Sequence, residues 1–171
     1  MTTTPGIRFN NIHLIVEAYR EAKTQMPLVL VGDFSTSDFA MRIREMVSSS
    51  PRRSGIIFTG SIFNQPLLAM LRCHSAAYIH GHSVGGTNPS LLEAMSCGNL
   101  IIAHDNPFNR EVVGEAALYF RSSGDLSQTL DRLNAKSSEL EDLGRMAKLR
   151  AQQKYRWEDV VLAYDKLFGG T

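Results

Sequence analysis

The chain of 171 residues lacks the features that would place it in a membrane or on nucleic acid. No apolar run approaches the roughly 20 residues that a membrane-spanning helix needs. Residues 1–6 show no signal-peptide pattern. Lysine and arginine number 18 against 17 acidic residues, so the formal net charge is only +1. Because a basic surface is the usual footprint of nucleic-acid binding, we expect no nucleic-acid partner.

Cysteine is also scarce, with Cys73 and Cys97 as the only two. Their spacing matches neither a zinc site nor the disulfide framework of a small secreted domain. We therefore expect reduced thiols packed in the core of a cytoplasmic protein. His80 and His82 lie two residues apart without a convincing third ligand, so we assign no metal site.

What the chain does contain is an alternation of short apolar strands and helices. With 43% hydrophobic and 20% charged residues, it can bury the core of one domain. Strands are predicted at residues 28–33, 55–60, 76–79, 100–104 and 117–120. Helices are predicted at residues 10–23, 37–47, 66–73, 126–133, 138–155 and 157–168, with one more from Pro89 onward. This order predicts an α/β fold with a Rossmann-like parallel sheet flanked by helices on both faces.

The most informative stretch is residues 78–109, where a strand stops at a glycine-rich loop and a helix follows. Asn88 is a good helix cap, and Pro89 suits the first helical turn. Free amides and the positive end of the helix dipole would then favour phosphate. The predicted phosphate-binding residues are Gly85, Gly86, Thr87 and Asn88. An ordinary strand-to-helix turn would give the same pattern.

These residues carry a resemblance. The run Pro-Ser-Leu-Leu-Glu-Ala-Met-Ser-Cys-Gly at residues 89–98 fits a signature helix without a gap. Val31-Gly32, Thr59-Gly60 and Glu17-Ala18-Tyr19 fit further family positions. The chain resembles the C-terminal, donor-binding domain of GT-B glycosyltransferases of the retaining group 1 family. The loop at residues 80–88 is similar to a rhamnosyltransferase-like branch that assembles bacterial surface polysaccharides.

The resemblance implies a nucleotide-sugar donor, linked to UDP or dTDP, and no cofactor. In the family, the helix glutamate bonds the ribose, a role that falls on Glu93. The implied base pocket, for uracil or thymine, consists of Thr59, Gly60, Ser61 and Ile62. His82 and Ser83 are the implied donor-sugar contacts. His104, Asn106, Phe108 and Asn109 could frame the sugar as well, although Asn106-Pro107 also signals a simple turn.

Two departures from the family pattern bear on catalysis. Many members carry a second glutamate, and counting back from Glu93 places Gly85 at that position. The family also neutralises the diphosphate with an arginine and a lysine. The lysine position falls at Asn10, and Arg8 is the candidate substitute for the arginine. The catalytic residue is therefore unknown.

The family enzyme has two domains, with the acceptor site and usually a catalytic histidine on the N-terminal one. This chain corresponds to the second domain, at residues 10–171, with residues 1–9 as a tag or truncated start. We therefore expect it to bind nucleotide sugar weakly and to transfer no sugar alone. The missing acceptor domain is the implied partner and could provide peripheral membrane association. Trp157 and Tyr164 are expected to be core or interdomain aromatics.

Two other classes of protein remain open. A dinucleotide-binding Rossmann module would carry Gly-x-Gly-x-x-Gly after its first strand, and this chain does not. A non-catalytic nucleotide-binding or scaffold domain could keep the fold after losing the chemistry. Gly85 and Asn10 stand where the family has a glutamate and a lysine, and these differences keep that alternative open.

Overall fold

The computed structural model describes residues 2–3, 10–134 and 137–169. Its strands are β1 Thr2–Thr3, β2 Leu28–Val31, β3 Ile56–Gly60, β4 Ala77–His80, β5 Leu100–His104 and β6 Ala117–Phe120. Its α-helices are α1 Ile12–Glu21, α2 Asp38–Ser48, α3 Gln65–Cys73, α4 Pro89–Cys97, α5 Pro107–Val113, α6 Ser123–Arg132, α7 Ser138–Lys154 and α8 Trp157–Phe168. A short 3-10 turn at Arg53–Gly55 precedes β3.

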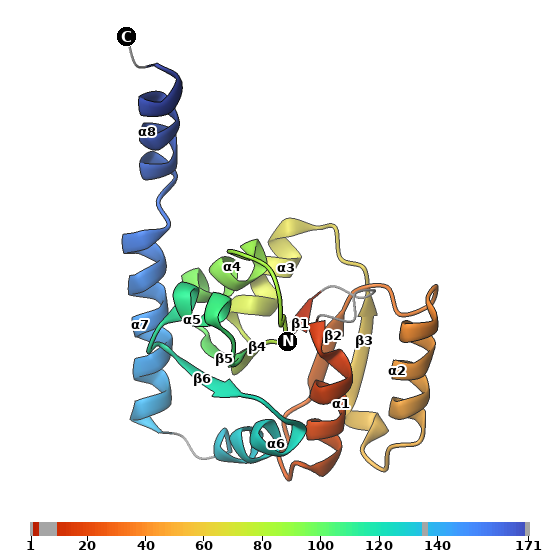
Figure 1. The fold of residues 1–171 in the computed structure, drawn as a ribbon. Coiled ribbons are helices and arrows are strands. Elements are labelled where there is room, and N and C mark those ends of the chain that lie inside the picture. The colour runs from red at the N-terminus through yellow and green to blue at the C-terminus, as the bar shows by residue number, and fades with distance from the viewer. Residues whose placement is uncertain (1, 4–9, 135–136, 170–171) are drawn as a thin grey trace.

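The strands pair in parallel and form two three-stranded sheets, in the orders β1-β2-β3 and β4-β5-β6. Helices cover both faces (Figure 1). The predicted α/β fold with a parallel sheet between helices is confirmed. The strand β1 was not predicted; its residues Thr2 and Thr3 pair with Leu30 and Val31 of β2.

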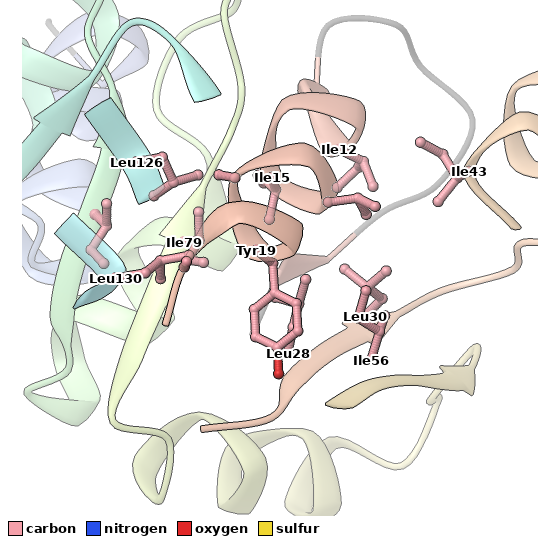
Figure 2. Close-up of a cluster of buried hydrophobic side chains, with 14 of the residues drawn as sticks. Ile12, Ile15, Tyr19, Leu28, Leu30, Ile43, Ile56, Ile79, Leu126 and Leu130 are labelled. Carbon is pink, nitrogen blue, oxygen red and sulfur yellow. The ribbon is translucent and has the colours of Figure 1, made fainter. Parts of the chain in front are cut away.

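Two hydrophobic cores lie on opposite faces of the strands. In β2, Leu28 and Leu30 belong to one core, whereas Val31 belongs to the other. The same alternation recurs in β5, because successive side chains of a strand point to opposite faces. Helices α1, α2 and α6 cover the first core, part of which Figure 2 shows. Helices α3, α4, α5 and α7 contribute to the second.

The segment after β5 differs from its prediction. Asn106-Pro107 was interpreted as a turn, but it begins α5. The Asn106 side chain accepts a hydrogen bond from the Asn109 N–H at 2.9 Å, and Pro107 occupies the first turn. A side-chain cap followed by proline is a regular helix start.

The prediction of reduced cysteines is wrong in this structure. Cys73 and Cys97 form a disulfide, with their Cα atoms 4.9 Å apart. Each cysteine is the last residue of its helix, α3 or α4, and these two helices pack against each other. The expectation of a cytoplasmic protein loses the support that it took from free thiols.

Helix α8 extends beyond α7, away from the body of the molecule (Figure 1). None of its residues is buried. Trp157 is 80% exposed and Tyr164 is 61% exposed, so neither is a core aromatic in this chain. Within the described residues, no helix is both long and apolar enough to cross a membrane.

Candidate functional site

The first main-chain N–H groups of helix α4 are hydrogen-bonded to its own capping residue, Asn88. The Asn88 side-chain oxygen accepts from the Ser90 N–H at 3.0 Å. The Asn88 carbonyl accepts from the N–H groups of Leu91 at 3.0 Å and Leu92 at 3.2 Å. Pro89 has no N–H to offer. The first amides of the helix are therefore occupied by Asn88, the predicted cap, and are not free for phosphate.

Unpaired amides lie one step earlier, in the loop between β4 and α4. The main-chain N–H groups of Gly85, Gly86 and Thr87 donate to no partner among the described residues. All three residues are exposed. They also precede the positive end of the α4 dipole, which favours an anion there. The candidate phosphate site is thus the loop before the helix and not the helix turn itself.

The conformation of Gly85 explains why glycine stands at a position where the family pattern has glutamate. Its φ angle is +110°, in a region that residues with a side chain rarely adopt. A Cβ atom at Gly85 would meet no other atom within 4 Å, so space is not the constraint. A glutamate at this position would therefore require a different loop path.

Glu93 is held by an ion pair that the sequence did not predict. Its carboxylate lies 2.6 Å from Nη1 of Arg72, whose side chain is only 4% exposed. The Glu93 side chain remains 48% exposed. Arg72 lies on α3 and holds the Glu93 carboxylate by this ion pair, while part of the Glu93 side chain stays exposed to solvent. The sequence offered one signal for this role of Arg72: it is the single charged residue in the mostly apolar segment that forms α3.

Thr87 and Glu93 share one cavity of about 780 Å³, here called the α3–α4 hollow. Its walls include Gln65 and Arg72 from α3 and Pro89 from α4. Trp157 of α8 also lines it. The structure therefore brings a predicted phosphate residue and the predicted ribose residue to one cavity.

The residues predicted for the base do not line that hollow. Thr59, Gly60 and Ser61 lie exposed at the end of β3, in the other three-stranded sheet. The Thr59 hydroxyl donates to the Gly60 carbonyl at 2.9 Å. Ile62 is half-buried and packs against the second core.

His82 sits between the loop and the core. Its ring stacks on that of His80, with ring centres 4.5 Å apart. Its Nε2 lies 3.2 Å from Nδ2 of Asn88. Because the Asn88 oxygen is engaged by Ser90, the amide NH₂ must face His82, so Nε2 accepts and Nδ1 carries the proton. Burial lowers the pKa of His82, which agrees with a neutral ring.

His80 lies beneath it and is only 1% exposed. Burial, and then the neighbouring His82 ring, lowers the pKa of His80 to about 3. Neither ring nitrogen of His80 has a hydrogen-bond partner in the described part of the chain. His80 is therefore a neutral core residue, whereas His82 and the half-buried Ser83 lie on the loop side.

Two asparagines tie the candidate loop to the loop after β5. Asn106 and Asn109 each donate from Nδ2 to the His82 carbonyl, both at 2.9 Å. They also donate to the His104 carbonyl, at 3.2 and 2.8 Å. Both amides are thus used within the protein. These bonds support the loop, and a role of the two asparagines in framing the sugar stays a prediction.

Of the two positions where the family has cations, the lysine position carries the uncharged Asn10. Arg8 lies outside the described residues. Asn10 is 2% exposed and packs closely on the loop: a Cβ atom on Gly81 would lie 2.1 Å from the Asn10 carbonyl oxygen. Among the described residues, no three histidine, cysteine, aspartate or glutamate side chains gather as a metal site.

Comparison with known proteins gives a family match over most of the chain. Residues 5–136 match the family model described as Glycosyl transferases group 1. An uncharacterised glycosyltransferase of Methanocaldococcus jannaschii is 25% identical over 170 residues, which cover 94% of this chain and 42% of the relative. The chain thus spans less than half the length of that relative.

Solved structures share the fold. HepE from Anabaena, in complex with UDP, superposes with a TM-score of 0.87 at 15% identity, over 99% of this chain and 48% of HepE. Sucrose-phosphate synthase from Thermosynechococcus elongatus superposes with a TM-score of 0.85 at 23% identity, over 99% of this chain and 45% of the synthase chain. The C-terminal domain of the group 1 protein LpcC from Francisella tularensis superposes with a TM-score of 0.79 at 17% identity, over 91% of this chain and 85% of that domain. At these identities the likeness shows the fold alone, that of a GT-B half.

Proposed function

The chain belongs to the group 1 glycosyl transferases, and from this premise we propose that it is the donor-binding half of a two-domain enzyme. That enzyme moves a sugar from a nucleotide-diphosphate sugar to a polysaccharide or glycolipid acceptor. One observation carries the proposal. Thr87, the last of the three loop residues with unpaired main-chain amides, lines the same hollow as Glu93, which the buried Arg72 holds by an ion pair.

This arrangement suits a nucleoside diphosphate. The loop amides are free to donate to the diphosphate oxygens, and they stabilise the charge that grows on the leaving group. Ribose hydroxyls donate to the open side of the Glu93 carboxylate, in charge-assisted hydrogen bonds. His82 and Ser83 then face the donor sugar. Arg8 is proposed as the accompanying cation.

The α3–α4 hollow contains none of the residues proposed to bind the base of the donor. We assign it to Thr59, Gly60, Ser61 and Ile62, whose main-chain groups can read a uracil or thymine edge. A UDP- or dTDP-linked donor follows from this assignment. The complex of the structurally similar HepE with UDP supports a pyrimidine nucleotide.

The status of this chain as the C-terminal half is also a proposal. It is supported by the likeness to the C-terminal domain of LpcC, of which this chain covers 85%. Helix α8 adds a second argument, because Leu167 and Phe168 are 76% and 77% exposed. Large apolar side chains exposed together on one helix are typical of an interface. The acceptor half would cover it and provide any peripheral membrane contact.

Alone, the chain then binds a nucleotide sugar without transferring the sugar. We place the whole enzyme in the rhamnosyltransferase-like branch, on the basis of the loop at residues 80–88, and a cytoplasmic location is a separate proposal.

The test is a calorimetric titration of the chain with UDP, dTDP, GDP and NAD. A pyrimidine diphosphate should bind most tightly. Glu93→Gln should weaken UDP binding by about 1–3 kcal/mol, because the neutral amide loses the charge-assisted bonds to ribose. The matched control is Glu45→Gln, an exposed glutamate on α2. Unchanged UDP binding by Glu93→Gln, or preferential binding of NAD, would overturn the proposal.

A non-catalytic nucleotide-binding or scaffold domain is the second candidate. Gly85 favours it, because this position offers no carboxylate to the donor sugar. The buried Asn10 favours it as well, since it cannot replace a phosphate-binding lysine. Acceptor-dependent release of UDP by the whole protein separates the two candidates: turnover supports the enzyme, and binding without turnover supports the scaffold.

A further inference from the structure

Arg72 is a buried cation whose charge depends on one acidic side chain. Only 3% of the residue is exposed. Among the described residues its guanidinium forms a single ion pair, in which Nη1 lies 2.6 Å from Oε2 of Glu93. Its buried Nε has no hydrogen-bond partner in the described part of the chain. A buried charge is costly unless it is paired, so Arg72 requires the Glu93 carboxylate to stay close.

The geometry of this ion pair is set by bonds on either side of it. The Arg72 carbonyl accepts a hydrogen bond from Nδ2 of Asn99, just beyond α4, at 2.7 Å. The neighbouring Cys73 forms the disulfide with Cys97 of α4. Glu93 and Cys97 lie four residues apart on α4, so they share one face of that helix. Arg72 is therefore fixed relative to the helix that carries its partner.

The two carboxylate oxygens of Glu93 consequently have different surroundings. Oε2 faces a guanidinium whose side chain is only 4% exposed, so this oxygen points toward the protein. The Glu93 side chain as a whole is 48% exposed and lines the α3–α4 hollow. Oε1 is thus the oxygen that remains for a ligand in the hollow.

A ribose presents two adjacent hydroxyls, at its 2′- and 3′-positions. A carboxylate with two accessible oxygens can accept from both hydroxyls, one on each oxygen. To do so, Glu93 would have to turn Oε2 away from Arg72. That turn would leave a buried guanidinium unpaired, which costs more than one additional hydrogen bond to ribose returns.

We propose that Arg72 determines the ribose specificity of this site: it keeps Oε2 of Glu93 engaged, so that Glu93 bonds one ribose hydroxyl and not two. The inference rests on the nucleotide site proposed above. Of the two nucleotides proposed there, UDP and dTDP, both carry the 3′-hydroxyl and only UDP carries the 2′-hydroxyl. A single contact that serves both is therefore with the 3′-hydroxyl. The substrate class then includes sugars linked to 2′-deoxyribonucleoside diphosphates as well as to ribonucleoside diphosphates.

The test is a calorimetric titration of the unaltered chain with UDP, 2′-deoxy-UDP and 3′-deoxy-UDP. The 2′-deoxy analogue should bind about as tightly as UDP, because the missing hydroxyl has no partner on Glu93. The 3′-deoxy analogue should bind about tenfold to a hundredfold more weakly, as expected for the loss of one hydrogen bond to a carboxylate. A comparable loss with 2′-deoxy-UDP would overturn the inference.

Glu93→Gln assigns the 3′-contact to this side chain. The neutral amide loses the charge-assisted bond, so the difference between UDP and 3′-deoxy-UDP should fall to about threefold. Glu45→Gln on α2 should keep the full difference. A full difference in Glu93→Gln would place the 3′-contact elsewhere and overturn the inference. Failure of the proposed function gives another result, because UDP would then not bind, or all three nucleotides would bind the unaltered chain equally.

Arg72→Met tests the arginine itself. The apolar side chain releases Oε2, so Glu93 can accept from both hydroxyls, and 2′-deoxy-UDP should now bind about tenfold more weakly than UDP. Arg72→Lys keeps a cation beside Glu93 and should preserve the original ratio of affinities. The matched control Arg145→Met, which removes an exposed ion pair on α7, should preserve it as well.

This ratio separates the proposed role from a structural one, because a general loss of stability weakens the binding of both nucleotides alike. An unchanged ratio in folded Arg72→Met would contradict the role of Arg72. If that variant does not fold, the comparison of the three nucleotides on the unaltered chain still decides whether Glu93 bonds one hydroxyl or two.

Discussion

The two three-stranded sheets of this protein differ in how complete they are. In the sheet β4-β5-β6, each pair of strands keeps an unbroken register over four residues. In the sheet β1-β2-β3, β1 contributes two described residues, and the register of the β2–β3 pair shifts between Leu30 and Val31. Ile57 of β3 is 45% exposed. Among the described residues, the sheet β4-β5-β6 is therefore the more complete of the two.

This difference matters for the candidate site. The loop amides, Glu93 and the supporting asparagines all follow β4 or β5, so they rest on the complete sheet. Of the residues proposed for the base, Thr59 and Gly60 end β3 and Ser61 and Ile62 follow it, on the less complete sheet. The residues proposed for phosphate and ribose therefore rest on one sheet and those proposed for the base on the other.

The largest expected effect concerns the complete half. Replacing both Cys73 and Cys97 by serine should lower the free energy of unfolding by about 3 kcal/mol, because the disulfide closes a loop of 24 residues in the unfolded chain. Urea denaturation measures this difference, and a reducing agent should produce the same loss in the unaltered chain. Ser96→Ala, an exposed neighbour on α4, is the control. Equal stability with and without reductant would show that the bond contributes nothing.

The next effect compares a glycine in each half. Gly81→Ala should cost about 2–3 kcal/mol, because the added Cβ would meet the Asn10 carbonyl oxygen at 2.1 Å. Gly60→Ala should cost about 1 kcal/mol, from its φ of +72° alone, since a Cβ there meets nothing within 4 Å. Thermal and urea unfolding of the two variants test the order. If Gly60→Ala lost more stability than Gly81→Ala, the loop after β4 would not be more tightly packed than the end of β3.

The smallest effect is the pH dependence of the complete half. The pKa of His80 is about 3 in the folded protein and about 6.5 in the unfolded chain. Below pH 6.5 the unfolded chain therefore binds more protons. The stability is fully present above that pH and should fall by up to about 1.4 kcal/mol per pH unit on acidification. His80→Phe should flatten the slope between pH 5.5 and 6.5, measured by urea unfolding at fixed pH values. Identical slopes would contradict the burial of a neutral His80.

Much of the fold could be predicted because its signals are local. The strands at residues 28–31, 77–80 and 100–104 are apolar apart from the histidines that end the last two, which indicates burial on both faces. The Asn88–Pro89 helix start was predicted and is confirmed. The same signal at Asn106–Pro107 was interpreted as a turn, although α5 begins there. A cap followed by proline is common to turns and helices, and only the residues beyond it decide.

The candidate site was less accessible to prediction. The sequence located the loop and its cap, Asn88, but it included Asn88 among the phosphate-binding residues, whereas the structure shows its oxygens bonded to the first helical amides. The Arg72–Glu93 pair was missed because its partners come from different helices. The disulfide was missed for the same reason. The roles of the loop amides, Glu93 and the β3 end in binding a donor stay predictions.

The sequence by itself determined the alternation of strands and helices, the two apolar faces of the central strands and the position of the glycine-rich loop. These features depend on residues within a few positions of one another. Only the tertiary structure decided which amides of the loop stay free, which side chain holds Glu93 and which cysteines pair. Those features depend on contacts between segments far apart in the chain, and local patterns do not encode such distances.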